Sequence, residues 1–357
     1  MPRISFASLR RRCLSLALLA ALSACAGLPV QDRTPELLAA TVPADYNGVV
    51  LVRASRSAAP VVRTWGSAQF ETPAAVSADT RFMIGSVSKW ITAVAVLRLV
   101  EQGKLALDEP VTTWLPELPA ASRAVTLRHL LSNTSGIENG LNLALKRDPG
   151  TGSLTITPLE AALRFGAGPL GFTPGTKFDY ASINWLLVAG VVERATGEPF
   201  MRVVTRLVFE PAGVRDTGFA DAATPGLPRM AIGYAADRKA RKMVPSPPMA
   251  AAAGTIYSTA NDLVRMADTV YGGLLGAAAR RELLTVQHAP EEYALGGRVK
   301  QVKNRALAWE SGVSGGYKTL LAYAPADGRA VVLLNNTDMA QSEQARIALA
   351  LLEGFDK

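Results

Sequence analysis

A serine and a lysine three residues apart, Ser86 and Lys89, are the pair in this sequence best suited to do chemistry. Residues three apart on a helix share a face, so the lysine amine can lie beside the serine hydroxyl. A buried lysine loses affinity for its proton and can accept the serine proton, which makes the serine a nucleophile. The alternative is a serine that caps a helix and is followed by a surface lysine. Because Ser-x-x-Lys is common by chance, the surrounding sequence must decide.

The segment that carries the pair is predicted to be a helix. From Ser86 to Gln102 apolar residues recur at intervals of three and four, and Gly103 follows as a C-terminal stop. Periodicity predicts further helices over residues 184–196 and 342–353. Lys89 would therefore lie one turn into a long helix.

Strands are predicted near both ends of the chain. Two hairpins of β-branched and apolar residues are expected, one pairing residues 48–53 with 60–66 and the other pairing 320–323 with 330–334. Helices and proline-rich loops occupy the middle. We therefore expect an α+β protein with one α/β lobe, residues 44–108 and 231–357, and a mostly helical inserted region, residues 109–230.

Composition indicates a folded protein without a metal or cofactor. The chain has 357 residues, 49% apolar and 19% charged, which excludes a disordered or collagen-like chain. Cys13 and Cys25 are the two cysteines, and His129 and His288 are the two histidines, so neither a thiolate cluster nor a multi-histidine zinc site is expected. We interpret both histidines as structural.

The net charge of +8 does not indicate a nucleic-acid partner. Four arginines precede the first acidic residue, and removal of residues 1–24 leaves a charge of +4. The remaining basic residues are scattered among acids, without the basic runs and interleaved aromatic residues that bind nucleic acids.

The N-terminus is predicted to be a targeting segment. The arginines are followed by an apolar run over residues 14–21, too short to span a bilayer and typical of a signal peptide over residues 1–24. Leu22-Ser23-Ala24-Cys25 resembles the bacterial lipobox, which implies a mature protein that begins with a lipid-modified Cys25. Residues 25–43 would then be a tether to the membrane. The alternative is an ordinary signal peptide with a chance cysteine.

This resemblance also implies a location in the cell envelope, with the protein facing the periplasm. Ala26, in place of an aspartate, favours the outer membrane by the sorting rule of such lipoproteins. Several acyl chains hold a protein on a membrane far better than one.

Several motifs in order resemble the serine β-lactamase and penicillin-binding protein superfamily, in particular its class C branch. The matching segments are residues 81–89, 103–111, 126–136, 174–180, 254–263 and 309–317. That branch contains class C β-lactamases, D-alanyl-D-alanine carboxypeptidases, aminopeptidases and esterases. The resemblance implies that residues 44–357 form a catalytic domain, with an antiparallel sheet flanked by helices, a mostly helical region beside it and the site in the cleft.

The resemblance also implies roles for individual residues. Ser86 would be the acylated nucleophile and Lys89 its proton acceptor. Tyr180 would carry a proton to or from the leaving group and the deacylating water, unless it is an ordinary core tyrosine. The backbone N–H groups of Ser86 and Val313 would form the oxyanion hole.

Two positions depart from the family pattern. Ser182 stands where an asparagine is expected, although its hydroxyl can still bind substrate. The third motif, Lys-Thr-Gly or His-x-Gly in the family, is Glu310-Ser311-Gly312 here. An anion in place of a cation would disfavour substrates with a carboxylate, which include penicillins and peptides ending in D-alanine. Alternatively, Glu310 turns away to pair with Lys318.

Two functional hypotheses follow. The first is an envelope-anchored serine hydrolase, monomeric, that forms an acyl-enzyme from a small-molecule or peptide ester, amide or lactam. The second is a catalytically degraded, penicillin-binding-like protein that binds an envelope ligand without turnover, which the residues at 182 and 310 suggest.

Overall fold

The computed structural model describes residues 34–72, 74–242 and 246–355. The predicted signal peptide, Cys25 and the first part of the tether lie outside these residues. Within the described part of the chain, no helix combines the length and apolar character needed to cross a membrane.

A six-stranded antiparallel sheet is built from both ends of the chain, as predicted. Its strand order is β2-β1-β11-β10-β9-β8. The bounds are β1 Gly48–Arg53, β2 Val61–Trp65, β8 Arg298–Val302, β9 Arg305–Ser314, β10 Tyr317–Tyr323 and β11 Ala330–Asn335. Because β1 pairs with β11 from Gly48 opposite Asn335 to Arg53 opposite Ala330, the N-terminal hairpin extends the C-terminal meander into one sheet.

The sheet is covered on both faces. Alternate side chains of its central strands point to opposite sides, and the side chains on both sides are apolar and buried. Val49 and Leu51 pack into the larger core, whereas Val50 and Val52 pack into a second core on the other face. Helices α2 (Thr34–Thr41) and α13 (Gln341–Gly354) contribute to the second core. On the opposite face lie α3 (Val87–Glu101) and α11 (Ala260–Thr269).

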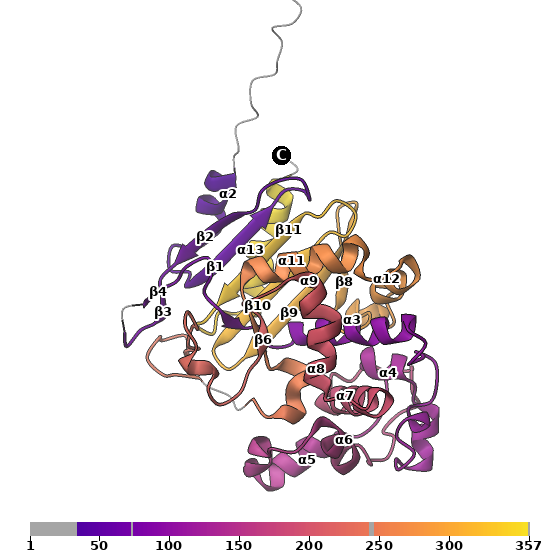
Figure 1. Cartoon of the computed structure of the whole chain (residues 1–357). Helices are drawn as coiled ribbons and strands as arrows, with labels where there is room; N and C mark the ends of the chain where they lie inside the picture. Colours follow the sequence, from indigo (N-terminus) through magenta and orange to yellow (C-terminus); the bar gives the residue numbers. More distant parts are fainter. Residues whose placement is uncertain (1–33, 73, 243–245, 356–357) are drawn as a thin grey trace, which may run out of the picture.

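Helix α3 is the central element of the larger core. Eleven consecutive residues, Val87 to Leu97, are buried, and Leu99 is buried too. A helix that is buried on all sides is expected when other elements surround it. Figure 1 shows α3 between the sheet and the helices of the inserted region. The predicted helix is therefore confirmed, and its surroundings hold its first turn in place.

The inserted region is mostly helical. It contains α4 Leu127–Leu131, α5 Gly140–Arg147, α6 Pro158–Phe165, α7 Ser182–Thr196, α8 Phe200–Val204, a π-helical turn Thr205–Phe209 and α9 Glu210–Ala212. Helix α7 begins two residues earlier than predicted and ends, as expected, before Gly197, whose φ is +70°. The boundaries predicted for this region at residues 109 and 230 stay a prediction.

A small sheet that was not predicted connects the two regions. Its strands are β5 Phe82–Met83, β6 Gly218–Phe219 and β7 Ile256–Ser258, in the order β5-β7-β6. The remaining elements are β3 Ser67–Gln69, β4 Ala74–Ala75, α10 Ala251–Gly254, a π-helical turn Val270–Leu274, α12 Ala277–Leu284 and several 3₁₀ turns. Because β5 ends three residues before Ser86, this sheet fixes the direction from which the chain enters α3.

Candidate active site

Ser86 lies at the N-terminal end of α3, where the chain turns from β5 into the helix. Gly85 precedes it with φ +51°, a conformation that favours glycine. Ser86 is the N-cap residue of α3, but its side chain makes no capping hydrogen bond. Its hydroxyl is therefore free for another partner, which contradicts the alternative of a purely capping serine.

Lys89 supplies that partner from one turn further along α3. Its side chain is buried, with 5% of the residue exposed, and Nζ donates to Ser86 Oγ at 3.1 Å. Nζ also donates to the carbonyl of Ala253 at 2.6 Å. Burial lowers the pKa of Lys89, and the neighbouring Tyr180 offsets part of this shift. The arrangement holds an amine with a lowered pKa beside the serine hydroxyl and contradicts the alternative of a surface lysine. Its role as proton acceptor stays a prediction.

Tyr180 lies just before α7 and is 47% exposed, so it is not a core tyrosine. Nζ of Lys89 lies 4.9 Å from the centroid of its ring. The ring also contacts two aromatic residues, with its centroid 6.4 Å from that of Phe178 and 6.3 Å from that of Tyr293. These contacts place the tyrosine next to the Ser86–Lys89 pair with part of its surface open to a ligand.

The end of β9 lies against the turn that contains Gly85 and Ser86. Strand β8 pairs with β9 only as far as Trp309, opposite Arg298. Beyond this pair β9 continues from Glu310 to Ser314 with β10 as its strand partner on one side only. The other edge is thus available to the residues around Ser86.

Two glycines permit this close approach. A Cβ at Gly312 would lie 1.9 Å from the carbonyl oxygen of Ile84 and 3.1 Å from the amide nitrogen of Ser86. A Cβ at Gly85 would lie 2.7 Å from the amide nitrogen of Val313. Since neither position has room for a side chain, the backbones of β9 and the turn meet directly. The amide nitrogens of Ser86 and Val313 both lie at this contact. Their role as the donors of an oxyanion hole stays a prediction.

A cavity of about 280 Å³ opens beside Ser86. Its lining is Ser86, Tyr180, Tyr293, Gly296, Gly297, Arg298, Trp309, Glu310, Ser311, Val313 and Gln341. The structure therefore brings together at one cavity five of the residues that the sequence singled out: Ser86, Tyr180, Glu310, Ser311 and Val313. Gly312 lies between two lining residues, and Lys89 contacts the cavity residue Ser86.

Ser182 is not among the residues that line this cavity. Its hydroxyl accepts a hydrogen bond from Nδ2 of Asn139 at 3.2 Å. Asn184 is buried, and its amide binds the Ser135 hydroxyl and Oδ1 of Asn133. Both side chains are therefore engaged within the inserted region, and a contact between Ser182 and substrate stays a prediction. The second partner of the lysine amine is instead the carbonyl of Ala253 on α10.

Glu310 lies in the cavity wall with its carboxyl group buried. The residue is 4% exposed, and a Cβ at Gly297 would lie 1.9 Å from its Oε2, so the carboxyl packs against bare backbone. Burial raises the pKa of Glu310 to about 8, against a smaller opposing effect of Arg298. The carboxyl is therefore protonated at neutral pH. Lys318 pairs with Asp338 at 2.8 Å, so the expected alternative of a Glu310–Lys318 pair is wrong.

Tyr293 is a cavity residue that the sequence did not reveal. It is buried, and its hydroxyl has no hydrogen-bond partner within the described part of the chain. The sequence signal that could have located Tyr293 is the glycine pair that follows it, Gly296 and Gly297. Gly296 has φ +81°, and a Cβ there would lie 2.5 Å from the carbonyl oxygen of Lys89. This close approach shows that the segment with Tyr293 and Gly296 packs against α3.

The two histidines lie outside the Ser86–Lys89–Tyr180 group. Nδ1 of His129 accepts from the amide of Thr126 at 3.2 Å in a capping box at the start of α4. His288 stacks on Phe178 with ring centroids 5.4 Å apart. Among the described residues, no group of three or more histidine, cysteine or acidic side chains is arranged to hold a metal ion.

Comparisons with known proteins agree with the geometry. A family model described as Beta-lactamase matches residues 43–354. Esterase EstB of Burkholderia gladioli is 39% identical over 172 residues, 45% of this chain and 44% of the esterase. The putative penicillin-binding protein PbpX of Bacillus subtilis (strain 168) is 27% identical over 259 residues, 72% of this chain and 62% of that protein.

The chain thus matches less than two thirds of the length of these two relatives. Among solved structures, the penicillin binding protein from Bacillus halodurans superposes with a TM-score of 0.75 at 25% identity. That alignment covers 91% of this chain and 99% of the other. The predicted fold, an antiparallel sheet with flanking helices, is confirmed.

The protonated state of Glu310 predicts a pH-dependent stability. The carboxyl has an ordinary pKa of 4.5 when unfolded and about 8 when folded, so folding takes up a proton between these pH values. The protein therefore loses stability as the pH rises from about 5 to about 8. Glu310→Gln removes this loss, and its free energy of unfolding should exceed that of the wild type by on the order of 4 kcal/mol at pH 9.

Urea denaturation of both proteins at pH 5, 7 and 9 measures this difference. The exposed Glu353→Gln is the matched control, which should show no such trend. A constant difference between Glu310→Gln and the wild type from pH 5 to pH 9 would show that Glu310 is ionised in the folded state.

Proposed function

Because the chain belongs to the beta-lactamase family, we propose that it is a serine hydrolase that forms an acyl-enzyme at Ser86 from an ester, amide or lactam. The observation that supports this best is the buried Lys89 amine 3.1 Å from the Ser86 hydroxyl. An amine with a lowered pKa next to a hydroxyl can take its proton at neutral pH.

The acylation step follows from this arrangement. Oγ of Ser86 attacks the carbonyl carbon while its proton passes to Nζ of Lys89. The negative charge that develops on the carbonyl oxygen is stabilised by the amides of Ser86 and Val313, each typically contributing about 3 kcal/mol. When the bond to the leaving group breaks, the leaving group takes up the proton through Tyr180, and water later releases the acyl group by the reverse path.

The position of Tyr180 also indicates which cavity holds the leaving group. A residue that gives a proton to the leaving group must be within hydrogen-bond reach of it. Tyr180 lines the same cavity as Glu310, so the leaving group occupies that cavity.

The chemistry of Glu310 favours uncharged leaving groups. The sequence predicted an anion at this position, but burial keeps the carboxyl protonated at neutral pH. The expectation that Glu310 repels a substrate carboxylate at neutral pH is therefore wrong. Repulsion begins only when the pH approaches about 8, where Glu310 ionises. At pH 7 a carboxylate-bearing substrate lacks the attraction that a lysine or histidine would provide, and a neutral ester is not penalised.

Ligand binding without turnover is the second candidate function. One observation favours it: the Asn184 amide is bound to Ser135 and Asn133, and Ser182 carries a hydroxyl rather than an amide, so neither side chain provides an amide for substrate.

We further propose that the protein is anchored to the cell envelope through a lipid on Cys25 and faces the periplasm, in the outer membrane. The support comes from the sequence of residues 1–26. We also propose that the folded domain acts as a monomer.

Ser86→Ala should abolish both hydrolysis and covalent labelling. In the wild type, a fluorophosphonate probe should add one adduct, which mass mapping places on Ser86. Lys89→Ala should slow hydrolysis by about 10²- to 10⁴-fold, the usual effect of removing a general base. Ser342→Ala, an exposed serine on α13, is the control and should behave as wild type. Undiminished labelling of Ser86→Ala would exclude Ser86 as the nucleophile.

Glu310→Lys should change the preference between neutral and anionic substrates. Wild type should hydrolyse p-nitrophenyl acetate and show little activity on a penicillin, whereas Glu310→Lys should gain activity on the penicillin, because a cation at about 6 Å attracts a carboxylate by on the order of 3 kcal/mol. Steady-state kcat/KM for both substrates at pH 7 measures this. Efficient penicillin hydrolysis by the wild type would contradict the argument.

Cys25→Ser should release the protein from membranes. A lipidated cysteine is the proposed anchor, so the variant should lose incorporation of labelled fatty acid and should move to the soluble fraction, whereas Cys13→Ser should remain anchored. Membrane fractionation of cells that express each variant measures this, and a fully processed, membrane-bound Cys25→Ser would argue against lipidation.

A further inference from the structure

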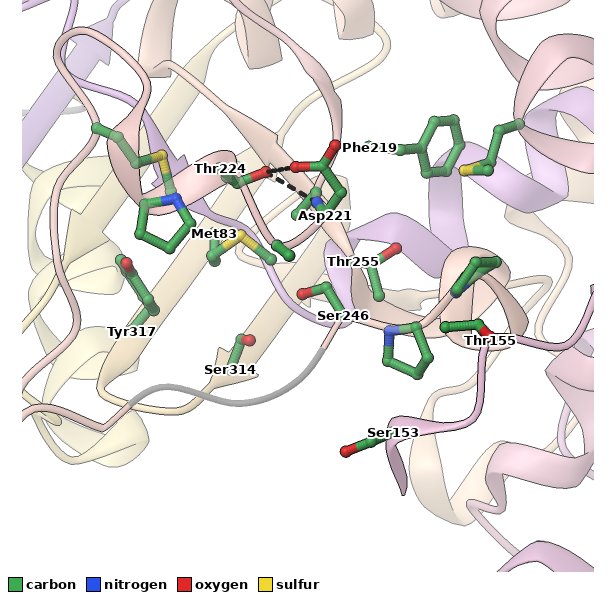
Figure 2. Close-up of a pocket in the computed structure, with 17 residues that line it drawn as sticks. Met83, Ser153, Thr155, Phe219, Asp221, Thr224, Ser246, Thr255, Ser314 and Tyr317 are labelled. Atoms are coloured by element: carbon green, nitrogen blue, oxygen red, sulfur yellow. Dashed lines mark hydrogen bonds between the residues drawn. The ribbon is translucent and has the colours of Figure 1, made fainter. Parts of the chain in front are cut away.

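A second and larger cavity borders the end of β9, where Ser314 lines it. Its volume is about 710 Å³, against about 280 Å³ for the cavity beside Ser86. Figure 2 shows side chains from the small sheet, from the end of the β9–β10 hairpin and from loops of the inserted region gathered around it. A cavity of this size accommodates a small organic ligand.

The wall of this cavity is largely apolar. Its apolar side chains include Met83, Met201, Phe219, Pro225, Met230 and Pro247. Methionine side chains adapt to ligands of different shape, and a surface of this kind favours a flexible hydrocarbon.

The larger polar groups at the wall are bound to protein partners. The Thr224 hydroxyl donates to Oδ1 of Asp221 at 3.1 Å and accepts from the amide of Asp221 at 2.8 Å (Figure 2). Oδ1 of Asp221 also accepts from the amide of Ala223. The Tyr317 hydroxyl donates to the carbonyl of Ala231 at 2.6 Å. An apolar ligand can therefore enter without leaving these groups unpaired.

The cavity adjoins the oxyanion residues. Ser314 in its lining directly follows Val313, and Met83 precedes the turn at Gly85. Thr255 in its lining follows Gly254, where a Cβ would lie 3.7 Å from the carbonyl carbon of Gly85. The larger cavity thus borders the residues next to the Ser86 and Val313 amides, which we propose hold the carbonyl oxygen of a bound substrate.

The geometry points to a division of the substrate between the two cavities. A carbonyl carbon attacked by Ser86 carries the leaving group on one side and the acyl chain on the other. Since the leaving group must face Tyr180 in the smaller cavity, the acyl chain extends toward the larger one. We propose that the larger cavity binds an apolar acyl chain and that the substrates are neutral esters of acyl groups longer than acetyl.

This inference rests on the proposed serine hydrolase function. In the reaction, the bond from Ser86 Oγ to the acyl carbon forms as the bond from that carbon to the alcohol oxygen breaks. The alcohol leaves with the proton that Ser86 gave up. The acyl chain stays in the larger cavity until water attacks the same carbon and restores the hydroxyl.

The first experiment varies the acyl chain at a constant leaving group. p-Nitrophenyl esters from acetyl to octanoyl are compared by kcat/KM. Each methylene that enters the cavity should raise kcat/KM by about fourfold, so that hexanoyl exceeds acetyl by at least about tenfold. A flat or falling series from acetyl to octanoyl would overturn the proposal.

The second experiment fills the cavity. Met201→Trp on α8 and Ala222→Trp at the exposed rim both add volume at lining positions, and the exposed position keeps the test valid if the α8 variant fails to fold. Each should lower the octanoyl-to-acetyl ratio of kcat/KM at least about tenfold, in line with the loss of several buried methylenes. An unchanged ratio in a folded variant would overturn the proposal.

Gln341→Trp is the matched control, because it adds the same side chain to the cavity beside Ser86. It should alter overall rates while keeping the wild-type octanoyl-to-acetyl ratio, and a ratio lowered as much as in the filling variants would overturn the assignment of the acyl chain.

A fluorophosphonate with a methyl substituent separates this inference from the function on which it rests. Absence of both an adduct on Ser86 and hydrolysis of every ester would refute the serine hydrolase itself. An adduct on Ser86 together with rates that do not depend on acyl length would refute only the acyl site.

Discussion

The site depends on the direct contact between the backbone of β9 and the turn that leads into α3. A side chain at Gly312 would collide with the carbonyl oxygen of Ile84, and one at Gly85 would collide with Val313. Because both positions lack a side chain, the amide of Val313 comes next to the amide of Ser86. Residues next to this contact line both cavities: Ser86 and Val313 line the smaller one, and Met83 and Ser314 line the larger one. One steric constraint therefore brings together the two amides that we propose as oxyanion donors.

Local sequence signals predicted the elements that carry the nucleophile. The periodicity after Ser86 correctly located α3, and the two apolar hairpins correctly located four strands of the main sheet. The short strands β5 to β7 were missed, because two- and three-residue strands give no periodicity. Two contacts of the site were also missed: the Ala253 carbonyl lies 164 residues from Lys89, and Tyr293 belongs to another distant segment. Such contacts depend on packing rather than on spacing.

The charge at Glu310 could not be predicted from the residue type alone. The sequence indicated a negative charge in the cleft, and the natural partner was the nearby Lys318. In the structure Lys318 binds Asp338, and the buried carboxyl of Glu310 packs against Gly297, where its neutral form is favoured. The cleft is consequently polar but uncharged at this position at neutral pH. This fits a family member whose substrate carries no carboxylate.

The pairing of β1 with β11 has a consequence for how the chain folds. The ribosome makes β1 and β2 long before their neighbour in the sheet, because that neighbour, β11, comes from residues 330–335. A two-stranded hairpin is marginally stable in water, so β1 and β2 have no lasting structure until the last strands are available. Contacts across nearly 300 residues make closure of the sheet slow and late. The main sheet of a nascent chain therefore cannot close until residues 330–335 have been made.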